Sequence, residues 1–291
     1  MHFSTKVEHF EPYDRISPAK LSSEFASKNV LISGGGYGIG ASIAHSFAEA
    51  HAASITIAGR TESRLKATAD ELNATYPETK VEYRVVDITS EKSVKALFAS
   101  ITTPLDVLVN NAGYLSKREN FVQADLKEWW QSFEVNVLGT AMVLQQFFQT
   151  RAKQKAEQQA VVINLNSIGA YNVLVPNLLS AYVGSKAAMW RMMEIISMDV
   201  LDQKVLPGGA RLISIHPGAV KTDMYWKAGL DGVVQIEPTD PQLAAEFIVW
   251  SASQEAAFLA NRLAWVNWDV DELVARKDEI VEKDMFRTAM S

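Results

Sequence analysis

Short apolar runs rich in β-branched residues alternate with longer amphipathic segments along this chain, and no other feature restricts the fold as strongly. Buried strands are short and apolar, whereas amphipathic helices repeat their apolar residues every three or four positions. The runs that predict strands are 29–33, 54–58, 81–86, 106–110, 160–165, 211–215 and 262–266. The segments that predict helices are 38–51, 61–75, 90–100, 125–154, 180–203 and 240–252. This alternation predicts an α/β fold with one doubly wound parallel sheet and helices on both faces.

The domain organisation follows from the absence of any dividing segment. No repeat, low-complexity tract or Gly/Ser linker interrupts the 291 residues, so we predict a single domain over 27–291. Residues 1–26 contain Pro12 and Pro18 and predict an N-terminal extension, either a strap across the surface or a partly disordered segment. Residues 268–291 predict a C-terminal helical extension, with a final helix over 269–287 that Asp269 caps.

Composition excludes several classes of protein. The chain has no cysteine, which excludes disulfides, thiolate nucleophiles and cysteine-ligated zinc, and its five histidines show no metal-binding spacing. We therefore expect no metal site. The net charge is −6 without a basic stripe, so we also expect no nucleic-acid partner. No apolar stretch approaches the roughly 18 residues that a membrane helix needs, and the N-terminus does not resemble a secretory signal. These features favour a cytoplasmic protein.

A glycine-rich loop, "SGGGYGIG", follows the first predicted strand and precedes a helix. Its glycines lie in a G-x-x-x-G-x-G spacing at Gly34, Gly38 and Gly40. Glycines allow a tight turn and a close approach of backbone to a pyrophosphate, which a helix N-terminus stabilises. The loop therefore predicts a dinucleotide site. The residues predicted to contact the cofactor here are Ser33, Gly34, Tyr37, Gly38, Ile39 and Gly40.

The ends of the next three strands indicate which dinucleotide binds. NAD-binding proteins usually place an acid after the second strand, but this chain has Arg60 there, and an arginine can pair with a 2′-phosphate. We predict NADP(H) as the preferred cofactor, with NAD(H) as the alternative because Glu62 lies close by. In "VVDIT", the Asp87 carboxylate is placed to reach the adenine. The remaining predicted contacts are Ile88 and, in "NNAG", Asn111, Ala112 and Gly113.

The segment "YVGSK" places Tyr182 and Lys186 four residues apart, on one face of a predicted helix. An ammonium group close to a phenol can lower the phenol's pKa, and a tyrosine tuned in this way can exchange protons near neutral pH. Alone, so short a pattern is also typical of two ordinary surface side chains.

Together these motifs resemble the short-chain dehydrogenase/reductase family over residues 28–255. The other matching segments are "FEVNVLG" with Asn136, "NLNSIGA" with Ser167, and "HPGAVKTDM" at 216–224. The resemblance implies a Rossmann-type dinucleotide-binding and catalytic domain, and an oxidoreductase that reduces a ketone to a secondary alcohol or catalyses the reverse. Near the C-terminus, "VNWD" stands where many members have "VDGG". This part resembles fungal members, including reductases of secondary metabolism.

The resemblance also implies a role for each catalytic position. Tyr182 would transfer the proton, Lys186 would favour its phenolate and bind the nicotinamide ribose, and Ser167 would orient the substrate oxygen. Asn136 would hold a water that links Lys186 to solvent. After the sixth strand, the turn that packs on the nicotinamide would contribute Pro217, Gly218, Val220 and Thr222. We expect a structural role for His216, which precedes that turn.

Substrate and assembly are predicted from the loops and helices around this site. The segments 114–120, 171–179 and 224–238 are rich in apolar and aromatic residues, which predicts a medium-sized, largely apolar carbonyl or alcohol as substrate. The side chains expected to face one cavity are Tyr114, Tyr171, Leu174, Tyr225 and Trp226. The apolar faces of helices 125–154 and 180–203 predict a homodimer or homotetramer. Two alternatives remain on the same fold: a non-redox cyclase or dehydratase, and a cofactor-binding protein without turnover.

Overall fold

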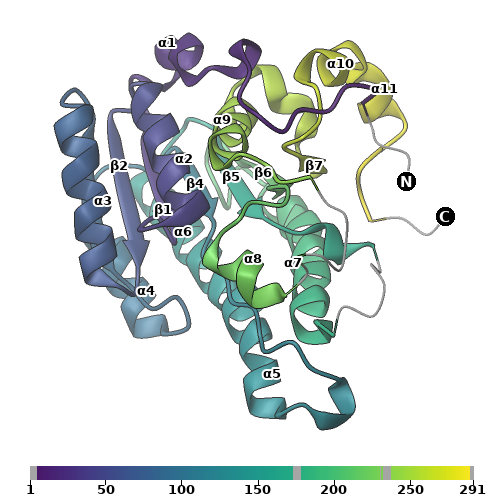
Figure 1. The fold of residues 1–291 in the computed structure, drawn as a ribbon. Helices are drawn as coiled ribbons and strands as arrows, with labels where there is room; N and C mark the ends of the chain where they lie inside the picture. The colour runs from purple at the N-terminus through teal and green to yellow at the C-terminus, as the bar shows by residue number, and fades with distance from the viewer. Residues whose placement is uncertain (1–4, 173–177, 230, 232–236, 289–291) are drawn as a thin grey trace.

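The computed structural model describes residues 5–172, 178–229, 231 and 237–288, and its centre is one parallel β-sheet (Figure 1). The seven described strands pair in the order β3-β2-β1-β4-β5-β6-β7. They are β1 (Asn29–Ser33), β2 (Ser54–Gly59), β3 (Lys80–Val85), β4 (Val107–Asn110), β5 (Ala160–Leu165), β6 (Ala210–His216) and β7 (Leu263–Trp265). The predicted α/β fold is therefore confirmed.

Helices cover both faces of the sheet, as predicted (Figure 1). The described α-helices are α1 (Ser22–Phe25), α2 (Gly38–Glu49), α3 (Glu62–Thr75), α4 (Glu91–Ala99), α5 (Leu126–Phe133), α6 (Thr140–Gln154), α7 (Ser180–Asp199), α8 (Asp223–Ala228), α9 (Pro241–Ala252), α10 (Val270–Ala275) and α11 (Lys277–Glu282). Alternate residues of β4 enter two separate cores: Val109 packs with α2, α3 and α9, and Leu108 packs with α4, α6 and α7. Because central strands are buried on both faces, they appear in the sequence as continuous apolar runs.

The strand order creates a switch point beside β1. This strand pairs with β2 on one side and with β4 on the other, and Ser33 lies opposite Asn110 at their carboxyl ends. After β3 the chain crosses back to the other side of β1, so the connections leave β1 and β4 toward opposite directions. Ligands of doubly wound sheets bind in the crevice that this reversal opens.

The helical segment predicted over 125–154 is confirmed, since the chain is helical without a break from Leu126 to Gln154, but it is not α-helical throughout. A π-helical segment, Glu134–Gly139, separates α5 from α6. Within it the side chain of Asn136 turns inward, where Nδ2 donates to Tyr114 O at 2.9 Å and to Ser185 Oγ at 2.8 Å. The wider turn thus directs a polar side chain to partners in other segments, and such turns are frequent at functional sites.

Residues 5–13, called here the N-terminal strap, cross the surface beside α10 (Figure 1). Glu8 forms an antiparallel bridge with Trp268, and the N–H of His9 donates to Asn267 O at 2.8 Å. Beyond the strap, two short 3-10 turns lead into α1, and the side chains of Ile16 and Phe25 are buried in the core. The extension is therefore anchored to the domain by both hydrogen bonds and apolar packing.

The single final helix predicted over 269–287 is wrong, because the chain breaks at Arg276 into α10 and α11. The predicted cap is confirmed, since the Asp269 carboxylate accepts the N–H of Glu272 at 2.8 Å. The change of direction at Arg276 allows both helices to bury an apolar side chain in the same core, Leu273 from α10 and Ile280 from α11.

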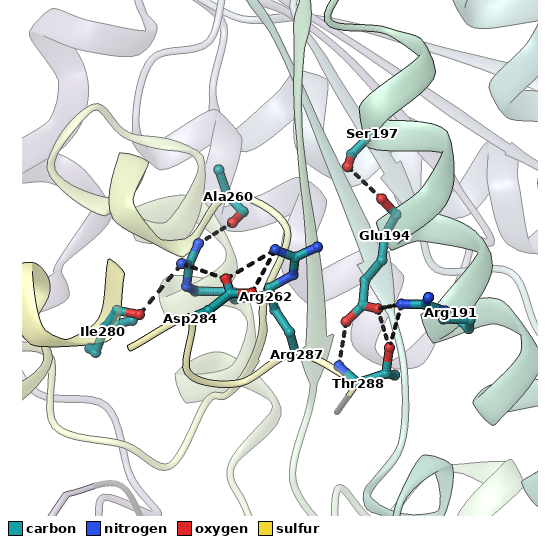
Figure 2. A network of polar contacts seen from close by, with 9 residues as sticks. All are labelled: Arg191, Glu194, Ser197, Ala260, Arg262, Ile280, Asp284, Arg287 and Thr288. Carbon is teal, nitrogen blue, oxygen red and sulfur yellow. Dashed lines mark hydrogen bonds and ion pairs between the residues drawn. The ribbon is translucent and has the colours of Figure 1, made fainter. Parts of the chain in front are cut away.

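The segment after α11 returns to the sheet and ends against α7 (Figure 2). The Glu194 side chain is buried there, accepts the N–H of Thr288 at 2.6 Å and pairs with Arg191 at 2.8 Å. Nearby, Arg262 and Arg287 both reach the Asp284 carboxylate, at 3.3 and 2.9 Å. One buried carboxylate of α7 therefore holds the end of the described chain.

Two further properties concern the surface. Leu138, Ile195 and Met198 are about half exposed, on the segments expected to form a subunit interface, and that interface stays a prediction. No helix among the described residues has the length and apolarity to cross a membrane.

We expect Glu194→Ala to lower the free energy of unfolding by about 1–3 kcal/mol, because it leaves the N–H of Thr288 and the charge of Arg191 without their partner. Urea unfolding monitored by tryptophan fluorescence measures the change. Glu91→Ala is the matched control, since Glu91 pairs with Lys95 on the surface of α4 and should contribute little. Equal unfolding midpoints for the Glu194 variant and the unaltered protein would contradict this account of the tail.

Candidate active site

Ser33 and Asn111 join the loops that follow β1 and β4. The Ser33 hydroxyl accepts the N–H groups of Asn111 and Ala112, each at 3.2 Å. In return, Asn111 Nδ2 donates to Ser33 O at 3.1 Å and to Gly34 O at 2.9 Å. The glycine loop and the 111–113 loop therefore form one unit at the switch point of the sheet.

Glycine is required in this loop for two different reasons. Gly34 and Gly38 have positive φ angles of 71° and 57°, which other residues rarely adopt. At Gly40 a Cβ atom would lie only 2.1 Å from Gly34 O, so α2 can pack on the loop only without a side chain there. The helix begins at Gly38 with no side-chain cap from Tyr37, so its first-turn N–H groups are not used by that residue. This cradle fits the diphosphate of a dinucleotide.

A hollow beside the glycine loop matches the predicted adenosine end of the site. Arg60 and Asp87 follow β2 and β3 and line it from one side. Burial opposes ionisation of Asp87, but the hydrogen bonds from Thr89 and the charge of Arg60 lower the pKa of the carboxyl below its ordinary value. The predicted contacts that line this hollow are Gly34, Tyr37, Arg60, Asp87, Ile88, Ala112 and Gly113.

Arg64 is a residue of this hollow that the sequence analysis missed. Its guanidinium lies over the ring of Tyr37, 4.5 Å from the centroid, and 3.4 Å from the carboxylate of Asp223 on α8. The available signal was its place in the first turn of the helix that follows Arg60, because that turn lies next to the end of β2.

Tyr182, Lys186 and Ser167 meet at the carboxyl end of β5. The ammonium nitrogen of Lys186 lies 5.8 Å from the ring centroid of Tyr182 and donates to Leu165 O at 2.7 Å. Ser167 lies close enough to the phenol of Tyr182 to lower its pKa, and its hydroxyl accepts the N–H of Gly169 at 3.2 Å. The structure thus brings together three of the four residues that the family pattern marked as catalytic.

The pKa values of the pair differ from the expectation. Although part of Tyr182 is open to solvent, protein atoms surround its hydroxyl, and this burial raises its pKa to about 12 despite the hydrogen bond from Ser167. Burial also lowers the pKa of Lys186 to about 7. The predicted lowering of the tyrosine pKa is therefore wrong for the protein without ligand, because desolvation outweighs the neighbouring amine. At neutral pH the phenol carries its proton.

Asn136, the fourth predicted catalytic residue, reaches Tyr182 through a residue that sequence reasoning missed. Its amide donates to Ser185 Oγ, which in turn donates to the carbonyl of Tyr182 at 2.7 Å. Its Oδ1 accepts the N–H of Tyr114 at 2.8 Å. Both N–H groups of the Asn136 side chain have partners within the protein. The water expected here would therefore donate its hydrogen bond to an oxygen atom of Asn136. The serine between the tyrosine and the lysine in "YVGSK" was the signal for Ser185.

The turn after β6 borders a second groove that continues from the glycine loop. The predicted contacts that line this groove are Tyr37, Gly38, Val220 and Thr222. Thr222 caps α8, since its hydroxyl accepts the N–H of Tyr225 at 3.4 Å. Pro217 is half-buried beside Gly218, and Ile39 packs against the core below the loop. The rings of His216 and Trp265 pack edge to face, with their centroids 4.9 Å apart. Burial lowers the pKa of His216 to about 3, which agrees with the expected structural role.

The side chains predicted to face one cavity have different neighbours. The ring of Tyr114 faces the ammonium of Lys227 at 4.4 Å, and Tyr171 packs against Trp190 and Trp265 at 5.6 and 6.4 Å. Tyr225 donates to Asp231, Trp226 lines the second groove, and Leu174 lies outside the described residues. Tyr182 packs instead against an apolar cluster of Leu115, Leu179 and Ala228, which Val183 and Met224 also contact.

Comparisons with known proteins agree with this geometry. The family model described as short chain dehydrogenase matches residues 28–231. The short chain dehydrogenase mpl6 of the fungus Monascus purpureus is 32% identical over 97% of this chain and 94% of its own length. The short chain dehydrogenase/reductase nsrO of Aspergillus novofumigatus is 30% identical over 98% of this chain and 95% of its own length. A crystal structure of a variant of actinorhodin polyketide ketoreductase with NADPH superposes with a TM-score of 0.72 at 21% identity, and covers 83% of this chain and 96% of that one.

We expect the stability difference between the unaltered protein and Lys186→Met to depend on pH. The pKa of Lys186 falls from 10.5 to about 7 on folding, so between these pH values the unfolded chain binds the extra proton and stability rises with pH. The methionine variant lacks this contribution. Urea unfolding at pH 6, 7, 8.5 and 10 should therefore show a difference that is constant below pH 7 and shifts in favour of the unaltered protein above it. Met189→Leu, a neutral change on the same helix, is the control, and a pH-independent difference for Lys186→Met would contradict the shifted pKa.

Proposed function

The chain belongs to the short-chain dehydrogenase family, and from this premise we propose that it is an NADP(H)-dependent enzyme that reduces a ketone to a secondary alcohol, or catalyses the reverse. The observation that carries the proposal is the convergence of Tyr182, Ser167 and Lys186, in which Ser167 acts on the phenol of Tyr182 and the ammonium of Lys186 lies 5.8 Å from its ring centroid. A proton donor, a second hydroxyl and an amine thus converge at the end of one strand. Family membership itself supports oxidoreductase activity, and the cofactor, substrate and residue roles are our proposal.

The cofactor is proposed to lie along the two hollows. The glycine cradle at the start of α2 would hold the diphosphate, Arg60 a 2′-phosphate and Asp87 the adenine. The turn at 217–222 would hold the nicotinamide. When bound, this group supplies or accepts the hydride. The actinorhodin polyketide ketoreductase structure, which has the same fold, was solved with NADPH, and this supports the choice of cofactor.

Tyr182 is proposed to give its proton to the substrate oxygen during reduction. Its pKa of about 12 keeps it protonated at neutral pH, and Ser167 would orient the same oxygen through a second hydrogen bond. Loss of the proton leaves a phenolate, which the positive charge of Lys186 stabilises. In the oxidative direction the same phenolate would accept the proton of the alcohol.

The substrate is proposed to be medium-sized and largely apolar. An apolar cluster from three separate segments packs against Tyr182: Leu115 before α5, Leu179 before α7 and Ala228 on α8, with Met224 beside it. Apolar surface next to the proposed acid favours a hydrophobic ketone over a small charged keto acid, whose charge would lose hydration there. Relatives of about 30% identity that span nearly the whole chain are fungal, which supports a role in fungal metabolism.

Stoichiometric use of NADPH distinguishes this proposal from the two alternatives on the same fold. A reductase consumes one NADPH for each alcohol formed, whereas a cyclase, a dehydratase or a protein without turnover leaves the cofactor unchanged. A panel of aromatic and polycyclic ketones, with small keto acids for comparison, tests the substrate class by the loss of NADPH absorbance.

We expect Tyr182→Phe to lower the rate of ketone reduction by about 10²–10⁴-fold, because general acid catalysis contributes on that order. NADPH affinity should change little, since the ring is retained. Steady-state rates and a fluorescence titration with NADPH measure the two effects. Tyr76→Phe, remote at the end of α3, is the control, and full turnover by the Tyr182 variant would remove the proposed acid.

We expect Arg60→Ala to weaken NADPH binding about 10–100-fold and to leave NADH binding nearly unchanged, because only NADPH carries a 2′-phosphate for a charge-assisted hydrogen bond. Parallel fluorescence titrations with the two cofactors measure this preference. Lys66→Ala removes an exposed cation on α3, the helix that begins two residues after Arg60, and is the matched control. If the unaltered protein binds NADH more tightly than NADPH, the assignment of Arg60 is overturned.

A further inference from the structure

Asn267 joins the N-terminal strap to the segment that follows β7. The N–H of His9 donates to Asn267 O at 2.8 Å, and Asn267 Nδ2 donates back to His9 O at 2.9 Å. One residue further along the strap, Phe10 O accepts the N–H of Asp240 at 2.8 Å. The strap is thus paired by backbone and amide groups to two segments that lie far from it in the sequence.

The same Asn267 amide continues the chain of hydrogen bonds to Thr239. Its Nδ2 lies 3.0 Å from Thr239 Oγ1, and both side chains are buried. The Thr239 hydroxyl then accepts the N–H of Ala219 at 3.2 Å, and the N–H of Thr239 donates to Ala219 O at 3.2 Å. The strap is therefore connected, through two buried side chains, to the turn that follows β6.

That turn is also packed directly against these two side chains. Gly218 has a positive φ of 75°, and a Cβ atom there would lie 2.2 Å from Thr239 Oγ1 and 3.0 Å from Asn267 Oδ1. The hydroxyl and the amide therefore determine how close the backbone of the turn approaches. Glu11 of the strap and Thr239 line the second groove together with Thr222, so this chain of contacts reaches the groove itself.

We infer that Asn267 and Thr239 are positioning residues that transmit the placement of the N-terminal strap to the nicotinamide end of the cofactor site. This inference rests on the proposed function, in which the turn at 217–222 holds the nicotinamide. Asn267 lies in "VNWD", where the chain departs from the family's usual C-terminal segment. The unusual C-terminal segment and the N-terminal strap are thus joined by the hydrogen bonds between Asn267 and His9.

The arrangement should act on one end of the cofactor only. The hollow proposed for adenosine is lined by Arg60, Asp87 and the glycine loop, and it shares neither Thr239 nor the strap with the second groove. Loss of the relay should therefore weaken contacts to the nicotinamide and leave contacts to the adenosine phosphate intact. General destabilisation of the protein would not separate the two ends.

The test compares NADPH with 2′,5′-ADP, which carries only the adenosine end. Thr239→Val keeps the shape of the side chain and removes the hydroxyl, so NADPH affinity should fall about tenfold while 2′,5′-ADP affinity stays within about twofold. Thr239→Ser retains the hydroxyl and should restore NADPH binding. Asn267→Leu is the second variant and should reproduce the effect of Thr239→Val.

Glu279→Ala is the control, because the Glu279 carboxylate pairs with Arg276 and Lys283 at 2.9 Å each, away from the strap and the turn. It should leave both affinities unchanged. Equal NADPH affinity for Thr239→Val and the unaltered protein, or equal losses for both ligands, would overturn the inference while leaving the proposed function intact. Failure of the unaltered protein to bind NADPH would overturn both.

Discussion

The hydrogen bonds between Ser33 and Asn111 close the switch point of the sheet, and the ligand-binding loops are built outward from them. The ends of the strands alone would not fix the conformation of the loops that follow them. Here the hydroxyl of one loop accepts two N–H groups of the other, so the glycine turn cannot move without the 111–113 loop. The absence of a side chain at Gly40 then lets α2 approach this unit closely enough to present its first turn to the crevice. These residues form the candidate site because they meet at the carboxyl ends of the central strands, and no single motif accounts for it.

Burial acts on Tyr182 and Lys186 in the same sense, toward the uncharged form of each. An isolated charge is costly where water is excluded, so neither a phenolate nor an ammonium is favoured alone. On the proposed mechanism the two charges would appear together, and their attraction is strongest where the surroundings are least polar. A raised tyrosine pKa in the resting protein is therefore compatible with acid–base catalysis. On the proposed mechanism, the charge of the lysine would then matter while the phenolate exists.

Local patterns in the sequence predicted much of this architecture, because strand burial and helix periodicity leave direct traces in residue order. They predicted β5 to the residue and placed Ser167 and Tyr182 at the end of that strand and on the next helix. They could not predict the π-helical segment around Asn136, since its partners Tyr114 and Ser185 come from other parts of the chain. The sign of the Tyr182 pKa shift was wrong for a related reason. Spacing shows that an amine is near a phenol, but only the packed structure shows how much water both have lost.

The N-terminal strap and the C-terminal tail both supply hydrogen-bond partners near β7, the last strand of the sheet. β7 is a short edge strand, and an edge exposes N–H and C=O groups that need partners. The N–H of Leu263 donates to Phe286 O from the C-terminal tail, and Glu8 of the strap bridges Trp268 directly after the strand. Because the strap must then pass Asn267 and Thr239, covering this edge also places a backbone segment beside the turn at Gly218. The same contacts that cover the end of the sheet therefore also fix one wall of the second groove. In this way the N-terminal strap, far from the proposed catalytic residues in sequence, borders the candidate site in space.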